Sequence, residues 1–488
     1  MKKKLSALLA AFALTLSLAA CGTAAPASTP PGTSAATLAD RLAQKVVSRI
    51  TADVTLDATT HSLHVTQQLV YHNDTGAKFQ SIYVNLIPNA FASSGGGIAM
   101  TSARAGGSDV ELAQVDGTVY SIALPEALEP GKDAALDFDY TVSIPNIENR
   151  FGWQDGIINA GNFLITPCVF ENGAWVVEPY VDIGDAFYTD IADYDVTLNL
   201  PDGWAAASAG EPGEDGAYHG RMRDYVFCAS DGFETLTDTI DGVDVTVYYR
   251  DKMDLTAKRT FETASNSLAL YNDILGRYPY SNLTLVLSGL TSGVSGTEYP
   301  TLVMVGPEIP LEGIDQTGAG TSADRNGYCW ELDRTVTHEV AHQWMYGIVG
   351  NDQIRYPWLD EGFCRFAEQL YMEVYPPAEP RADWVYDISD LFRDEYDMLT
   401  KATAGMSANM NWTLYDWIGG EPSDYGEIYT KGASLWYKLR EQLGNDAFNA
   451  ALREYVNEFA WSFVTPDTFK AFWNERGDFS ALFKLYGI

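Results

Sequence analysis

Residues 331–347 read ELDRTVTHEVAHQWMYG, and they hold two of the six histidines in this 488-residue chain. On a helix, His338 and His342 stand one turn apart and project from the same face, so both can bind one ion. Neutral imidazole is a good zinc ligand, and Glu339 lies beside the pair without needing to ligate. The stretch therefore predicts a metal-binding helix with a carboxylate next to the metal.

A second stretch, RYPWLDEGFCRFAEQLY over residues 355–371, offers a third ligand. A catalytic zinc takes three protein ligands and keeps an open position for water. Glu361 follows His342 after eighteen intervening residues, on a predicted helix that can lie against the first. Glu368, on the same face, is expected to accept the free N–H of a ligand histidine, unless it is a solvated surface residue. Asp360 is expected to orient the site or to cap its helix.

These motifs resemble the aminopeptidase N-type gluzincin metallopeptidases, a family that includes leukotriene A4 hydrolase. The resemblance rests on HEVAHQW and WLDEGF, and it extends over about residues 45–488. Further matching segments are GDAFYTDIADYDVTLNLP (184–201), GRYPYSNLTLV (276–286) and YTKGASLWYKLREQLG (429–444). It implies a multidomain fold: an N-terminal all-β domain, antiparallel and saddle-like, followed by an α+β thermolysin-like catalytic domain.

The resemblance also implies roles for individual residues. One zinc ion per chain would be held by His338, His342 and Glu361. Glu339 would act as the general base, and Tyr429 would stabilise the transition state, with Tyr425 as the nearest alternative tyrosine.

The segment SGTEYP (295–300) stands where the family has its G-x-M-E-N exopeptidase signature. Gly296 and Glu298 are therefore expected to contact the substrate, with Glu298 near its α-ammonium. Ser295, Thr297 and Tyr299 depart from the signature. A second polar residue near the amine would come from the β domain, and Glu171 or Glu178 are candidates for it.

The N-terminus, MKKKLSALLAAFALTLSLAACG, has a basic start, an apolar run and then small residues. This pattern predicts a signal peptide over residues 1–20. The end at Leu18-Ala19-Ala20-Cys21 resembles a bacterial lipobox, so Cys21 is expected to be acylated and to anchor the protein to the outer side of the cell membrane. An ordinary signal with a chance cysteine is the alternative. Residues 21–45 are expected to be a flexible tether.

Composition and periodicity predict the rest of the organisation. Residues 46–250 alternate apolar and polar residues between turn residues, which predicts an all-β domain, and residues 251–488 change to helical spacing with two strands near 282–306. The net charge of −35, from 66 acidic and 31 basic residues, excludes a nucleic-acid binder. Export would place Cys168, Cys228, Cys329 and Cys364 in a compartment where disulfides can form, so they are expected as disulfides or as buried thiols.

Three functions fit these observations. The first is a lipid-anchored zinc aminopeptidase that acts on peptides. The second is a zinc endopeptidase or oligopeptidase that does not need a free N-terminus, and the third is a non-catalytic surface binding protein. An epoxide hydrolase of the leukotriene type is a more distant fourth. Side-chain preference and oligomeric state leave no mark in the sequence.

Overall fold

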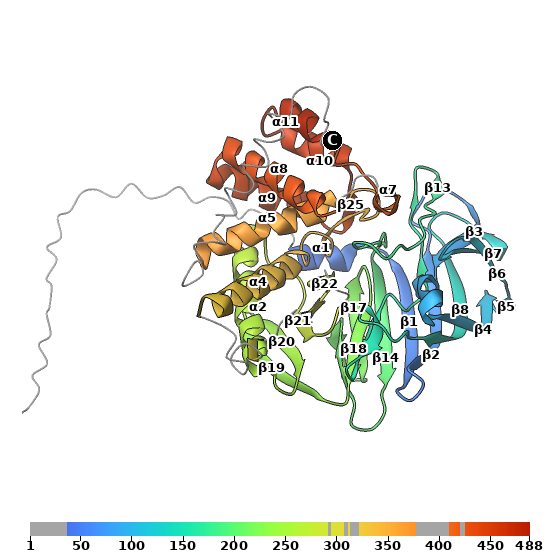
Figure 1. Ribbon diagram of the computed structural model, residues 1–488. Coiled ribbons are helices and arrows are strands. Elements are labelled where there is room, and N and C mark those ends of the chain that lie inside the picture. Colours follow the sequence, from blue (N-terminus) through green and yellow to red (C-terminus); the bar gives the residue numbers. More distant parts are fainter. Residues whose placement is uncertain (1–36, 291–293, 307–310, 313–321, 377–408, 420–424) are drawn as a thin grey trace, which may run out of the picture. The chain divides into compact units, whose positions relative to one another are not determined.

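The N-terminal half consists of strands whose side chains alternate between a buried and an exposed face. In β1 (Ser48–Asp57), residues 50, 52, 54 and 56 are buried and the residues between them are exposed. A computed structural model describes residues 37–290, 294–306, 311–312, 322–376, 409–419 and 425–488 (Figure 1). The predicted all-β region is confirmed, and its strands pair antiparallel except for β1 and β14 (Ala192–Asn199), which run parallel.

The β region forms three sheets and a small hairpin. The eight-stranded sheet has the order β16 (Glu211–Pro212), β17 (Ala217–Met222), β14, β1, β2 (Ser62–His72), β8 (Asp133–Ser143), β4 (Gly97–Ala105) and β5 (Ser108–Asp109). One four-stranded sheet has the order β15 (Ala205–Ser208), β18 (Val226–Ser230), β10 (Ile157–Gly161) and β9 (Phe151–Gln154). The other has the order β11 (Thr166–Pro167), β3 (Phe79–Asn85), β7 (Val119–Leu128) and β6 (Leu112–Asp116). The hairpin pairs β12 (Phe170–Glu171) with β13 (Ala174–Trp175), and the 3-10 helix η1 spans Ile87–Ser94.

The predicted domain boundary at residue 250 is too late. Strands β19 (Phe233–Ile240) and β20 (Val243–Arg250) belong to a five-stranded sheet with β21 (Asn282–Leu287), β23 (Leu302–Val305) and β22 (Gly296–Tyr299), in the order β19-β20-β21-β23-β22. Their alternating sequences looked like those of the preceding strands. Sequence periodicity reports a half-buried strand and does not report its partner, so β20 was assigned to the wrong sheet.

Helices dominate the C-terminal half, as the sequence predicts. They are α2 (Asp254–Ile274), α4 (Ser322–Ala341), α5 (Trp358–Val374), α7 (Leu414–Ile418), α8 (Glu427–Leu443), α9 (Asn445–Phe459), α10 (Pro466–Asn474) and α11 (Ser480–Tyr486). A two-stranded parallel pair, β24 (Val349–Asn351) with β25 (Ser462–Val464), joins segments far apart in sequence. In α2, Ala264, Leu268 and Tyr271 are buried at the predicted spacing, and Gly276 follows the helix with a φ of +105°.

Two features of this half position the site. Strand β22 is at the edge of the five-stranded sheet, with only β23 beside it, and its neighbour across the site is α4. Helices α4, α5 and α8 pack against one another in sequence order (Figure 1). The contact between α5 and α8 is close, because a Cβ atom on Gly362 would lie 2.6 Å from the Cα of Gly432.

The expected tether ends earlier than residue 45. Helix α1 (Leu38–Gln44) has two buried leucines, Leu38 and Leu42, and the indole N–H of Trp461 donates to the Leu38 carbonyl. An amphipathic turn with its own buried contacts cannot act as a flexible linker. The signal peptide, the rest of the tether and Cys21 lie outside the described residues. Among the described helices, none has the length and apolar character that a membrane span requires.

Candidate metal centre and its cleft

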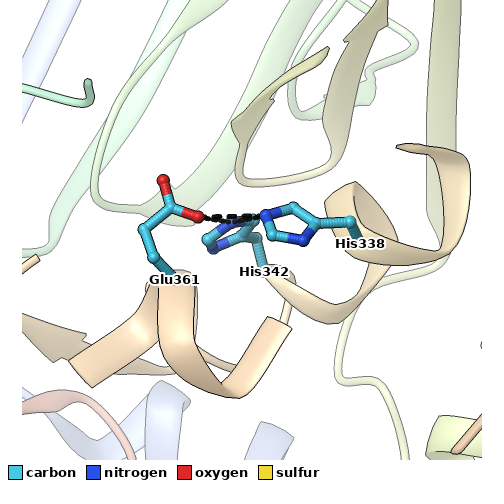
Figure 2. A group of neighbouring side chains, drawn as sticks. All are labelled: His338, His342 and Glu361. Carbon is cyan, nitrogen blue, oxygen red and sulfur yellow. Dashed lines mark hydrogen bonds and ion pairs between the residues drawn. The ribbon is translucent and has the colours of Figure 1, made fainter. Parts of the chain in front are cut away.

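The motif histidines are presented by α4 and the turn that follows it. Helix α4 ends at Ala341, and the backbone N–H of His342 still donates to the His338 carbonyl at 3.3 Å, so both side chains remain on one face. Glu361 projects from the first turn of α5 toward them (Figure 2). The two imidazoles and the carboxylate are all buried.

The three side chains form a small triangle of ligand atoms (Figure 2). His338 Nε2 lies 3.0 Å from Glu361 Oε2, His342 Nε2 lies 3.4 Å from the same oxygen, and the two Nε2 atoms are 3.2 Å apart. Ligands bound about 2.0–2.1 Å from a tetrahedral zinc ion stand roughly 3.4 Å from one another. The triangle therefore has the edge lengths that such an ion requires.

Each histidine is held by its other ring nitrogen. His338 Nδ1 is 3.1 Å from Glu368 Oε1, and His342 Nδ1 is 3.1 Å from the Met345 carbonyl oxygen. A carbonyl oxygen can only accept, and Glu368 accepts as a carboxylate, so both Nδ1 atoms carry the proton. Both Nε2 atoms then keep a lone pair directed at the centre of the triangle.

Glu339 lies beside the triangle without belonging to it. Its side chain is buried, and burial raises its pKa to about 7, against the lowering effect of His338 and His342. Gly296 of β22 provides the space that Glu339 occupies, because a Cβ atom at position 296 would lie 2.3 Å from Glu339 Oε1. A carboxylate with a pKa near neutrality suits a proton acceptor that later returns the proton.

Glu298 occupies the adjacent part of the site. It offers a carboxylate oxygen within 4.8 Å of ligand atoms of Glu339 and His342, and it is almost fully buried. Burial raises its pKa, and the nearby Asp185 raises it further. The side-chain amide of Gln353 donates to Glu298 at 2.9 Å and to Asp360 at 2.8 Å. Asp360 thus helps to fix Glu298 through Gln353, and its Oδ1 accepts the backbone N–H of Glu361.

Tyr429 comes to the triangle from the first turn of α8. Its hydroxyl donates to Glu361 Oε1 at 2.8 Å, and its ring lies 5.9 Å from the His338 ring. Burial raises its pKa, and Glu361 raises it further, so the hydroxyl keeps its proton. Tyr425 also lines the cleft but packs edge-on against Tyr429.

A cleft of about 700 Å³ contains this site, and both halves of the chain line it. The β region contributes Arg150 and Asp185, which form a buried ion pair, together with residues 182–184. The C-terminal half contributes the metal triangle. It also contributes Gly296, Glu298, Glu339, Glu368, Tyr425 and Tyr429. The structure thus gathers the residues that the motifs predict, with Asp360 directly behind them.

The candidates from the β region are wrong. Glu171 and Glu178 both pair with Arg355 and do not line the cleft. The acidic group that the β region brings to the cleft beside Glu298 is Asp185. No motif indicated a role for Gln353 or Asp185, or for Arg334 and Arg365, which also line the cleft. Of the four cysteines downstream of Cys21, Cys168, Cys228 and Cys364 are buried free thiols, and Cys329 lies half-buried in α4.

Comparison with known proteins agrees with this geometry. Residues 259–484 match the model of the peptidase family M1 domain. The match covers 226 of the 488 residues and assigns the helical part of the chain to the peptidase family M1 domain. The chain is 27% identical over 227 residues to aminopeptidase M1-D of Oryza sativa subsp. japonica, covering 46% of the chain and 24% of that protein. It is 22% identical over 372 residues to leukotriene A-4 hydrolase of Xenopus laevis, covering 73% of the chain and 57% of that protein.

Solved structures show that the fold is shared. The M1 zinc metallopeptidase from Deinococcus radiodurans superposes with a TM-score of 0.61 at 19% identity, over 90% of this chain and 91% of that one. A mutant of the same enzyme bound to a Tyr-Ser-Ala substrate superposes with a TM-score of 0.59. The match to this chain spans about a quarter of the length of aminopeptidase M1-D.

Proposed function

We propose that this protein is a zinc-dependent aminopeptidase that removes the N-terminal residue of peptides. The observation that carries the proposal is a single cleft in which a three-ligand metal triangle, the carboxylate of Glu339 and the carboxylate of Glu298 lie side by side. The ligand set of two imidazoles and one carboxylate is the one that zinc peptidases use. Zinc bound there would supply a Lewis acid that polarises the scissile carbonyl and acidifies a water molecule.

The chain's own residues then perform the remaining tasks. Glu339 accepts a proton from the attacking water and returns it to the leaving amine, which its pKa of about 7 permits. Tyr429 donates a hydrogen bond to the carbonyl oxygen as negative charge builds on it. Glu368 and the Met345 carbonyl keep both imidazoles in one tautomer and orientation throughout.

Glu298 would set the register of cleavage. It stands on β22, whose free edge can pair with an extended peptide as one more strand. A carboxylate at this point would pair with the substrate α-ammonium, so that only the first peptide bond reaches the metal. Burial disfavours the charged form of Glu298, and a bound ammonium group would favour it.

The direct test is metal content together with hydrolysis by the purified protein. Elemental analysis should find one zinc per chain. A panel of aminoacyl 4-nitroanilides should be hydrolysed, and removal of the metal with a chelator should abolish the activity, which zinc should restore. N-acetylated versions of the same substrates should be poor. If acetylated peptides are cut as fast as free ones, the endopeptidase alternative replaces this proposal.

We also propose that the enzyme is a lipoprotein on the extracytoplasmic face of the cell membrane. The support is the lipobox-like Leu18-Ala19-Ala20-Cys21 after an apolar run, followed by a small, proline-rich segment. Its substrates would then be peptides outside the cytoplasm.

A further inference from the structure

Two arginines line the same cleft and share one carboxylate. Arg334 of α4 and Arg365 of α5 both contact Glu368 Oε2, and the Arg334 Nε atom lies 2.7 Å from it. The side chains are 25% and 12% exposed, and Glu368 is 4% exposed. Two largely desolvated cations therefore face one anion, which itself also contacts His338.

Most donor groups of these arginines remain available. A guanidinium carries five N–H donors in a planar fork that matches a carboxylate. Among the described residues, Glu368 is the only carboxylate in ion-pair contact with either arginine, and each contact uses one nitrogen. The Arg334 guanidinium also lies 4.5 Å from the Trp330 ring centroid, which fixes its plane. Burial lowers the pKa of Arg365, Glu368 raises it, and the nearby Arg334 lowers it again. Two cations thus share one carboxylate.

The arginines stand at the opposite end of the metal triangle from Glu298. Glu298 groups with His342, whereas Glu368 and its two arginines group with His338. The cleft lining thus has the Glu298 carboxylate on the His342 side and two arginines on the His338 side, with Glu331 and Glu368 beside the arginines.

We propose that Arg334 and Arg365 form a subsite for the C-terminal carboxylate of short peptides, so that the enzyme prefers substrates with both ends free. This inference rests on the proposed aminopeptidase function and adds the substrate class. The α-ammonium pairs with Glu298, the first peptide bond lies at the metal, and the terminal carboxylate meets the arginine pair. Arg104 on β4 is exposed, pairs with Asp109 and does not line the cleft, so Arg104→Gln offers a matched arginine control.

The test compares tripeptides that differ only at the C-terminus. The metal-loaded native enzyme is assayed on X-Ala-Ala as the free acid and as the C-terminal amide, where X is the residue best cleaved in the nitroanilide panel. A hydrogen-bonded ion pair of this kind should favour the acid by about ten- to a hundred-fold in kcat/KM. The native comparison needs no variant. X-Asp-Ala amide tests whether a side-chain carboxylate can replace the C-terminal one. Its kcat/KM should remain as low as that of X-Ala-Ala amide.

Variants assign the preference to the arginines. Arg334→Gln, at the more exposed position, should bring the acid-to-amide ratio close to one by slowing the acid, whereas Arg104→Gln, outside the cleft, should keep the ratio. Equal rates for acid and amide in the native enzyme would overturn the inference. It would also be overturned if X-Asp-Ala amide were hydrolysed as fast as X-Ala-Ala free acid, because a side-chain carboxylate would then replace the terminal one. So would an Arg334→Gln variant that slows acid, amide and nitroanilide by one common factor, because the arginine would then only hold Glu368. Failure to hydrolyse any nitroanilide would instead refute the aminopeptidase proposal itself.

Discussion

At the scale of single residues, the site separates binding of the metal from transfer of the proton. His338, His342 and Glu361 direct their ligand atoms at one point, and Glu339 is beside them in space made by Gly296. Four neighbouring carboxylates, those of Glu298, Glu339, Glu361 and Glu368, thus have different partners and different expected tasks.

The division between ligand and base is tested by two variants. Glu339→Gln keeps the size of the side chain and all three ligands, so zinc should remain at one per chain while kcat falls by about 10²–10⁴-fold. Glu361→Ala removes a ligand, so zinc itself should be lost on dialysis. Glu129→Gln changes an exposed carboxylate outside the cleft, so it is the matched control and should keep both properties. Equal zinc loss in the first two variants would show that Glu339 is a ligand.

The role of Glu298 is tested on substrates with and without a free amine. Glu298→Ala should reduce kcat/KM on free-amine peptides by roughly ten- to several-hundred-fold, because a charge-assisted contact is lost, while zinc content changes little. Glu298→Gln keeps a group that can contact Gln353 and removes only the charge, so it should show a similar loss. If neither variant changes the preference for free over N-acetylated peptides, Glu298 does not recognise the amine.

At the scale of elements, the position of Tyr429 depends on how closely α8 approaches α5. Gly362 and Gly432 face each other at the crossing of these helices, three residues from Tyr429 on one side and next to Glu361 on the other. A side chain at either position would separate the helices at this point. The hydrogen bond between Tyr429 and Glu361 is therefore set by two glycines that do no chemistry.

Substitution at this crossing should affect stability and turnover together. In Gly432→Ala the new Cβ atom would lie 2.5 Å from Gly362 Cα, and such overpacking typically costs about 1–3 kcal/mol of unfolding free energy. The melting temperature and kcat should both fall, with zinc retained. Gly76→Ala, where a Cβ atom meets nothing within 4 Å, is the control and should resemble the native protein. An unchanged kcat in a destabilised Gly432→Ala variant would show that turnover does not depend on the position of Tyr429 set by this crossing.

At the scale of the whole molecule, the cleft exists only because the two halves of the chain meet. The fully buried Arg223 of the β region donates to the carbonyl oxygens of Tyr346 and Ser462, at 2.9 Å each. In the other direction, Arg355 of the C-terminal half forms ion pairs with Glu171 and Glu178 of the β region. These contacts hold the Arg150–Asp185 wall against the metal centre, so the β region is part of the active-site architecture.

The lipid anchor is the remaining prediction at this scale. Native protein expressed in bacteria should incorporate labelled palmitate and sediment with membranes, because Cys21 follows a lipobox-like sequence. Cys21→Ser should lose the label and appear in the soluble extracytoplasmic fraction, with nitroanilide hydrolysis unchanged. Continued labelling of Cys21→Ser would place the lipid elsewhere.

The sequence by itself indicated His338 and His342 as a ligand pair, Glu339 beside them and the order of β region before helices, because each depends on local spacing. Glu361 follows His342 after eighteen intervening residues, and its assignment as third ligand depended on the second helix and on the family resemblance. A helix puts residues four apart on one face, and a strand alternates its two faces. The pairing of His338 with His342 and the alternation of β1 can therefore be predicted from sequence alone. Only the tertiary structure decided which strands share a sheet, and it moved β19 and β20 into the peptidase half. It also placed Asp185, Arg334 and Arg365 in the lining of the cleft and Gln353 against Glu298. Contacts between segments far apart in the chain have no period in sequence, since they depend on how whole elements pack.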